Sequence, residues 1–201
     1  MSKILLTAFE AFGGESINPA RLALEALEAE DVIRLYLPVE YEKASRLVLE
    51  AIDAHRPAAV VSIGQAGGRD AVTPEKYAVN IRDSASPDSA GRICLKEAVI
   101  PGGAEKLEST FGAEQITDTL LECGIPARIS ENAGTYVCND VMYSVLWKLK
   151  DTNIPAGFIH VPYCHEQLTN HPDCFGMDLS EITRALKIAL DDIKQRMESA
   201  F

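Results

Sequence analysis

The sequence lacks any run of basic residues, and its 19 Lys and Arg face 30 Asp and Glu, for a formal charge of -11. Binding to nucleic-acid phosphates requires clustered Lys and Arg, so this composition argues against a nucleic-acid partner. No apolar stretch approaches the roughly 20 residues of a membrane span. We therefore expect a soluble protein with neither a nucleic-acid nor a membrane partner.

An export signal and a regular cysteine framework are also absent. The N-terminal apolar run over residues 3–9 is too short for a signal peptide and is typical of a buried first strand. The cysteines are odd in number and irregularly spaced, which indicates reduced thiols in a cytoplasmic protein. They are Cys94, Cys123, Cys138, Cys164 and Cys174. The Cys and His residues between 164 and 174 match no common zinc spacing, so no metal site is expected.

The glycine-rich run Gly64–Arg69 follows an apolar segment directly. It lacks the GxxxxGK[ST] pattern of a phosphate-binding loop, and its glycines do not fit GxGxxG. We interpret it as a loop that brings backbone close to a small substrate, with Arg69 orienting a carboxylate or bracing the loop.

Apolar runs alternate with amphipathic segments along the chain, and no linker, repeat or low-complexity tract interrupts them. This alternation predicts a single-domain three-layer α/β/α sandwich over residues 1–201, with a mostly parallel central sheet. Strands are expected over residues 3–9, 32–37, 58–63, 75–81, 127–130 and 158–161. Helices are expected over residues 18–28, 41–55 and 113–123, from about residue 138, and from residue 178 to the end. Loops and a short hairpin over the site are expected between residues 82 and 109.

A cysteine and a histidine stand where this fold places its crevice. Cys138 lies near the start of a predicted helix, and His160 lies near the end of a short apolar strand. In a parallel α/β sheet both places fall on the same rim. A helix N-terminus favours the thiolate, and the turn at Gly134 could supply backbone N–H groups for an oxyanion. The ordinary role of each residue is core packing, but the pair predicts a cysteine nucleophile with a histidine base.

A histidine base needs a third group that fixes its tautomer. Two carboxylates compete for this role: Glu75, just past the glycine-rich run, and Asp88 in a later Pro-Asp dipeptide. Sequence spacing does not separate them. Phe9 and Phe12 follow the first strand and would either pack in the core or enclose a small flat ring.

Taken together, these segments closely resemble the pyroglutamyl peptidase I family, the pyrrolidone-carboxylate peptidases. The resemblance covers nearly the whole chain and rests on several motifs in the same order. The matching runs are Leu5–Gly14 with Asn18-Pro19, Gly64–Arg69 with Thr73–Glu75, Ala78–Asn80, Ala133–Asn139, Phe158–Tyr163 and Glu166-Gln167.

The resemblance implies a cysteine omega-peptidase that removes an N-terminal L-pyroglutamyl residue from peptides. It implies Cys138 as nucleophile, His160 as general base and acid, and Glu75 as the residue that orients His160. Substrate-binding positions implied by the matching runs are Phe9, Phe12, Gln65 and Asn80. The family is cytosolic, needs no metal or cofactor, and commonly forms homotetramers.

The chain departs from the family pattern at Ala85, where many members carry an arginine. Arg82 or Arg69 is a possible substitute for that arginine. A second departure is Cys164-His165, where apolar residues and proline are usual. These departures leave two other hypotheses open: an amidase for a different small acyl group, and a non-catalytic binder of lactam ligands.

Overall fold

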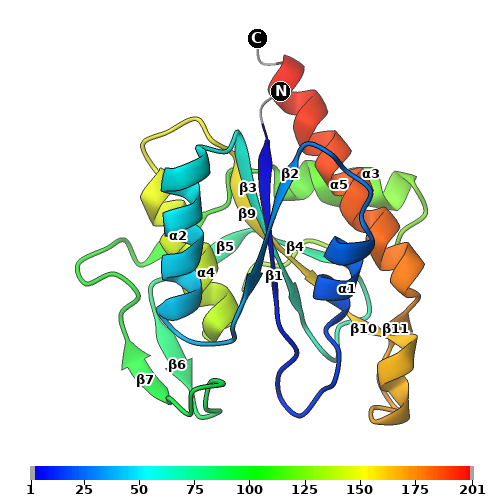
Figure 1. The fold of residues 1–201 in the computed structure, drawn as a ribbon, viewed down its shortest axis with the longest axis horizontal. Coiled ribbons are helices and arrows are strands. Elements are labelled where there is room, and N and C mark those ends of the chain that lie inside the picture. Colours follow the sequence, from blue (N-terminus) through cyan, green and yellow to red (C-terminus); the bar gives the residue numbers. More distant parts are fainter. Residues whose placement is uncertain (1–2, 200–201) are drawn as a thin grey trace.

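The fold is built on a five-stranded sheet with the strand order β2-β1-β3-β9-β4. It is seen in a computed structural model, which describes residues 3–199. Four strands, β1, β2, β3 and β9, are parallel, and β4 joins the edge antiparallel to β9. The carboxyl ends of the four parallel strands therefore meet along one rim of the sheet (Figure 1).

Strands and helices alternate as the apolar pattern predicts. The strands of the central sheet are β1 (Ile4–Phe9), β2 (Val32–Leu37), β3 (Ala59–Gln65), β4 (Thr73–Glu75) and β9 (Ala156–Val161). The helices are α1 (Pro19–Ala26), α2 (Lys43–His55), α3 (Ala113–Glu122), α4 (Val137–Leu149) and α5 (Leu179–Ser199), with a short 3-10 helix over His165–Thr169.

The helices cover both faces of the sheet in a three-layer arrangement (Figure 1). Ile4, Leu6 and Ala8 of β1 pack in a core with α1, α3 and α5, while Leu5 and Phe9 pack in a second core with α2 and α4. This division follows from the two-residue period of a strand, which sends successive side chains to opposite faces.

Local sequence determines where α1 begins. The Asn18 side chain accepts a hydrogen bond from the Ala20 backbone N–H at 3.0 Å, and Pro19 occupies the first helical position. Both residues suit a helix start, because the Asn18 side chain accepts a backbone N–H that has no partner within the helix, and Pro19 has no N–H that would need one. The predicted start is confirmed, and the helix ends two residues before the predicted Glu28.

Two strand predictions are wrong in detail. Residues 127–130 form no strand, and only isolated bridges join Ala127 to Val72 and Ser130 to Glu75. The predicted strand over 75–81 is divided at Lys76 into β4 and β5 (Tyr77–Val79). β4 pairs with β9, whereas β5 pairs with β8 (Lys106–Glu108), because the chain leaves the central sheet after Glu75.

The segment between residues 82 and 109 contains the expected hairpin, formed by β6 (Arg82–Ser84) and β7 (Cys94–Glu97). Its base is fixed to the turn before α4. Asp83 N–H donates to the Thr135 carbonyl at 3.0 Å, and the Thr135 hydroxyl donates to the Asp83 carbonyl at 2.5 Å. β10 (Tyr163–Cys164) and β11 (Gly176–Met177) form a separate pair after β9, across the rim from the β6–β7 hairpin (Figure 1). No helix within residues 3–199 is long and apolar enough to cross a bilayer.

Candidate active site

Cys138 is the second residue of α4, so its backbone N–H is among those that the helix leaves unpaired. The turn before it requires a positive φ at Gly134, which is +84°, and the Gly134 N–H donates to the Asn132 side chain at 2.8 Å. The side chain of the N-cap residue, Tyr136, makes no capping hydrogen bond in the described part of the chain, residues 3–199. The N-terminus of α4 therefore presents free N–H groups beside the thiol.

Gly64 of β3 makes room for the Cys138 sulfur. A Cβ atom at Gly64 would lie 3.2 Å from Sγ of Cys138 and 2.9 Å from Cζ of Phe158. Gly64 is also the register partner of His160 in the β3–β9 pair. The thiol consequently lies over the strand position directly beside the histidine, as the rim argument predicts.

His160 and Glu75 form a buried pair on the α4 side of the sheet. The His160 Nδ1 and the Glu75 Oε1 are 2.7 Å apart, and the two residues are 4% and 0% exposed. The antiparallel register places Glu75 opposite Phe158, two residues before His160 on the same face of β9. This register brings the carboxylate to the imidazole, a contact between residues 85 positions apart in the sequence.

The pKa shifts define the resting protonation state. Burial opposes ionisation of Glu75, but the His160 hydrogen bond and the nearby charges outweigh it and hold the pKa of Glu75 below its usual range. An ionised carboxylate only accepts, so Nδ1 of His160 carries the proton and Nε2 is left as the acceptor. Burial lowers the pKa of His160, although Glu75 opposes this shift. The imidazole is therefore neutral at pH 7, with Nε2 able to take a proton.

The resting state of the Cys138 thiol depends on its burial as well as on the helix N-terminus. Burial, and next the negative charge of Glu75, raise the pKa of Cys138 to about 12, and Arg69 opposes this rise. The helix N-terminus favours a thiolate, but desolvation of the charged form outweighs it. The resting pair is thus a thiol and a neutral imidazole, and the thiolate has to be formed by proton transfer.

The competing carboxylate, Asp88, is used elsewhere. Its Oδ2 accepts the Tyr41 N–H at 3.0 Å, and its Oδ1 accepts the N–H groups of Ala90 and Arg92 at 3.0 and 2.8 Å. Asp88 therefore caps a turn, and the structure joins Glu75, rather than Asp88, to His160.

The predicted substrate residues lie in different settings. Phe9 is buried at the end of β1 with its ring 6.3 Å from that of Phe158, and Phe12 is partly buried in the same core. Gln65 is 7% exposed, and its Oε1 accepts a hydrogen bond from Gln167 at 3.0 Å. The Asn80 amide is engaged by backbone groups, because it donates to the carbonyls of residues 100 and 103 and accepts the N–H of residue 100.

Two residues directly after Cys138 have structural roles that the sequence patterns did not predict. Asn139 is fully buried and bonds the backbone of Val79 and Ile81, which attaches α4 to β5. Asp140 is fully buried and accepts from Arg82 Nε at 2.6 Å and from the Ser45 hydroxyl at 3.0 Å. The signal was available, since two consecutive polar residues interrupt an otherwise apolar helix and must find partners when buried.

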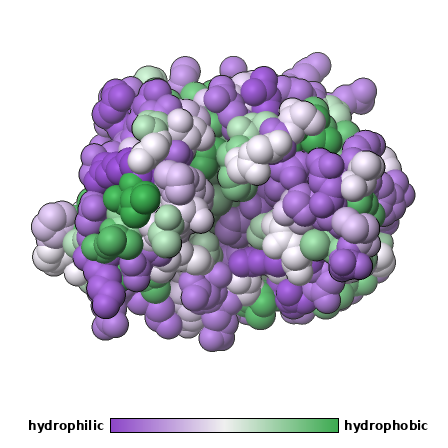
Figure 2. Space-filling model, turned by 90° about the horizontal axis from the view of Figure 1, so that it is seen from below, coloured by the Kyte–Doolittle hydropathy of each residue, from purple (hydrophilic) through white to green (hydrophobic). Residues whose placement is uncertain are grey.

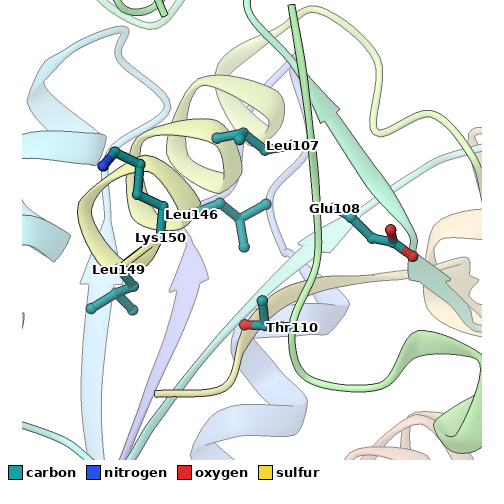
Figure 3. A pocket seen from close by; sticks show the side chains of 6 residues that line it. All are labelled: Leu107, Glu108, Thr110, Leu146, Leu149 and Lys150. Carbon is teal, nitrogen blue, oxygen red and sulfur yellow. The ribbon is translucent and has the colours of Figure 1, made fainter. Parts of the chain in front are cut away.

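The face at the carboxyl ends of the parallel strands is hollowed at its centre (Figure 2). Apolar side chains gather on the β6–β7 side of this hollow, where Ile93 and Leu95 are 49% and 66% exposed. A separate pocket of about 200 Å³ lies at the other end of α4 (Figure 3). Thr110, which lines this pocket, donates to the carbonyl of Ala156 at the start of β9. The pocket therefore lies at the amino end of β9, whereas His160 lies near its carboxyl end. It is lined by Leu107, Glu108, Thr110, Leu146, Leu149 and Lys150.

Within residues 3–199, no group of three or more His, Cys, Asp or Glu side chains is arranged to hold a metal ion. His165 and His171 instead pair with single carboxylates, Asp178 at 2.9 Å and Glu15 at 2.6 Å. The imidazoles near Cys164 and Cys174 therefore have structural partners of their own.

An α/β sheet with a thiol, an imidazole and a carboxylate on its carboxyl rim defines the class of cysteine hydrolases. Comparison with known proteins specifies the family. Residues 2–196 match the family model described as pyroglutamyl peptidase. The chain is 39% identical to the pyrrolidone-carboxylate peptidase of Lactobacillus johnsonii, over 96% of this chain and 93% of that protein.

Solved structures agree with the sequence match. The pyroglutamyl peptidase I of Bacillus amyloliquefaciens superposes with a TM-score of 0.90 at 34% identity, covering 96% of this chain and 94% of that one. The pyrrolidone carboxyl peptidase of Thermococcus litoralis gives a TM-score of 0.92 at 32% identity, covering 100% and 97%. The chain belongs to the pyroglutamyl peptidase family of cysteine peptidases.

Proposed function

We propose that this protein removes the N-terminal L-pyroglutamyl residue from peptides with Cys138 as nucleophile, His160 as general base and acid, and Glu75 as the orienting carboxylate. The observation that carries these assignments is the 2.7 Å contact of His160 Nδ1 with the buried Glu75 carboxylate, beside the strand position that seats the Cys138 sulfur. This arrangement gives the imidazole one free nitrogen, Nε2, on the rim where the thiol lies.

The reaction begins when Nε2 of His160 takes the proton from Cys138. The thiolate attacks the pyroglutamyl carbonyl and forms a tetrahedral oxyanion, which collapses as protonated His160 gives its proton to the leaving amine. The resulting thioester is hydrolysed by a water that the same imidazole activates. Because the thiol pKa lies far above that of the imidazole, binding and oxyanion stabilisation have to favour the charged state during attack.

The oxyanion is assigned to the unpaired backbone N–H groups at the start of α4. Ala85 is exposed and stands where the family resemblance predicts an arginine, and neither arginine considered as its substitute is free for that role. Arg82 is paired with buried Asp140, and Arg69 is bonded to Glu75. The helix N-terminus, with its partial positive charge and free donors, is the remaining source of stabilisation.

Recognition of pyroglutamate needs a small apolar enclosure with polar groups for the lactam. The lactam N–H and C=O would each cost about 1–3 kcal/mol if buried without a partner. We assign the ring to Phe9 and Phe12, and polar contacts to Gln65, with Asn80 holding the neighbouring turn. Proline has a similar ring without the lactam carbonyl, so a site that satisfies this group discriminates against prolyl substrates.

We further propose a homotetramer in the cytoplasm that needs no cofactor. The thiols are free in the structure, as suits a reducing compartment, and the exposed Ile93 and Leu95 offer an apolar surface for contact between copies. Light scattering after gel filtration measures the assembly directly, and a monomer at micromolar concentration would overturn this part of the proposal.

The test of the activity is release of a fluorescent amine from pyroglutamyl-amide beside the matched prolyl and alanyl amides, under reducing conditions. We expect release from the pyroglutamyl substrate alone, blocked by iodoacetamide. Cys138→Ala should remove turnover while circular dichroism stays unchanged. Turnover by that variant would refute the mechanism, and release from a different acyl amide alone would indicate an amidase of other specificity.

A further inference from the structure

The glycine-rich run folds Arg69 back over the edge of the sheet. Gly68 has a φ of +83°, and the Arg69 N–H bonds the Ala66 carbonyl at 3.3 Å, which closes a tight turn. Gly67 lies against Tyr163, since a Cβ there would be 2.2 Å from the Cζ of that ring. The glycines thus allow the chain to turn back sharply, and this turn places Arg69 over the sheet.

The Arg69 guanidinium joins three parts of the active site. One nitrogen donates to the Glu75 Oε1 at 2.5 Å and also bonds the Thr73 hydroxyl. The other donates to the Asn132 carbonyl at 3.3 Å, just before the turn that opens α4. Thr73 is the register partner of His160, and its hydroxyl donates to the His160 carbonyl at 3.3 Å. One cation therefore links the carboxylate, the histidine strand and the nucleophile turn.

Arg69 also compensates the buried negative charge of Glu75. Glu75 is fully buried, and its Oε2 has no hydrogen-bond partner within residues 3–199. A buried ionised carboxylate is costly unless it is paired, and the neutral resting imidazole contributes a hydrogen bond but no charge. In the described part of the chain, Arg69 is the one permanently charged partner of Glu75. Its charge also opposes the rise that burial and Glu75 impose on the pKa of Cys138.

We propose that Arg69 is a positioning residue of the reaction, which holds the Glu75 carboxylate ionised against His160 and places a positive charge at the turn that precedes the nucleophile helix. This inference rests on the proposed roles of Cys138, His160 and Glu75. Arg69 acts through Glu75 and through its charge, and it needs no contact with the substrate.

The test compares Arg69→Gln, which removes the charge, with Arg69→Lys, which keeps the charge and loses the planar fork. Arg128→Gln is the matched control, because Arg128 pairs with neighbouring Asp70 on the surface, where the two side chains are 53% and 64% exposed. Two quantities are measured in each variant: steady-state kcat and KM on pyroglutamyl-amide, and the rate of Cys138 alkylation by iodoacetamide, followed by mass spectrometry of the Cys138 peptide. Exposed Cys123 serves as the internal reference for alkylation.

Removing a nearby positive charge raises a thiol pKa by about one unit or more, and one unit is a tenfold loss of thiolate at fixed pH. We therefore expect Arg69→Gln to slow Cys138 alkylation at pH 8 about tenfold and to lower kcat by at least about tenfold, with KM changed less than about threefold. Arg69→Lys should restore the alkylation rate and only part of kcat, because one ammonium cannot reproduce the fork. Arg128→Gln should match the wild type in both quantities.

A merely structural arginine would give a different result. Arg69→Gln would then unfold at a lower temperature, but its correctly folded fraction would keep the wild-type alkylation rate and the wild-type kcat per reactive thiol. That result would overturn the proposal. Alkylation requires no turnover, so it tests Arg69 even if the substrate assignment fails. Absence of pyroglutamyl-amide release by the wild-type protein would instead overturn the proposed function.

Discussion

Replacing Glu75 by Gln separates the formation of the thiolate from its use in catalysis. The substitution keeps the shape of the side chain but removes a fully buried charge that accepts from His160 at 2.7 Å and from Arg69 at 2.5 Å. The amide can donate as well as accept, so it no longer requires the proton of His160 to stay on Nδ1. The correct tautomer, with Nε2 free, is then no longer enforced.

The expected loss of activity is large. In serine hydrolases, replacement of the corresponding carboxylate by an amide lowers kcat about 10⁴-fold through the wrong tautomer. We expect Glu75→Gln to lower kcat by about 10³- to 10⁴-fold for the same reason. The folded state should lose about 1–3 kcal/mol of stability rather than the full cost of breaking a buried pair, because the Arg69 side chain is 21% exposed and water hydrates its freed charge.

The thiol should respond in the opposite direction. The negative charge of Glu75 raises the pKa of Cys138, after burial, so its removal lowers that pKa and increases the thiolate fraction at any given pH. We expect Cys138 alkylation by iodoacetamide to become several-fold faster in Glu75→Gln while turnover collapses. Slower alkylation in this variant would refute the neutral resting pair, since it would mean that Glu75 supports a preformed thiolate and imidazolium.

The pH profiles give a second check on the same residues. His160 must be neutral to accept the thiol proton, so kcat/KM falls as pH drops through its pKa, which lies below the usual 6.5. Glu75 supports this pKa, so Glu75→Gln should move the acidic limb to still lower pH. In the wild type, the stability from ionised Glu75 is present above pH 4.5 and is lost as pH falls through the lowered folded pKa. A wild-type acidic limb above pH 6.5 would contradict the assignment.

Two further substitutions test the geometry around the nucleophile. Gly64→Ala places a Cβ 2.9 Å from Phe158 and 3.2 Å from the Cys138 sulfur, so kcat should fall at least about tenfold at a stability cost of about 1–3 kcal/mol. Unchanged kcat with pyroglutamyl-amide would show that the sulfur does not occupy this place during the reaction. The second substitution tests the ion pair at the nucleophile helix. Asp140→Asn removes the buried negative charge that pairs with Arg82 and should lower the free energy of unfolding by about 3–5 kcal/mol, measured by urea denaturation. A loss below 1 kcal/mol would contradict the buried ion pair.

The sequence predicted those features that depend on neighbouring residues. The apolar periods located the strands and helices, and Asn18-Pro19 fixed the start of α1, because a cap and its helix lie within a few residues of one another. The position of Cys138 after a glycine turn and of His160 near a strand end placed both on one rim. The order of the motifs along the chain indicated the family, which the comparisons confirm.

Tertiary structure decided everything that depends on residues distant in sequence. Sequence spacing did not separate Glu75 from Asp88 as the partner of the histidine. The antiparallel register of β4 on β9 places Glu75 within hydrogen-bonding distance of His160. Residues 127–130 pair with Val72 and Glu75 through isolated bridges and not through a continuous ladder, which local sequence could not predict. The helix N-terminus alone favours a thiolate at Cys138, but desolvation in the folded protein raises the thiol pKa, so the proton has to pass to His160. Desolvation and strand register depend on which surfaces pack together, whereas caps and periodicity are properties of a few adjacent residues.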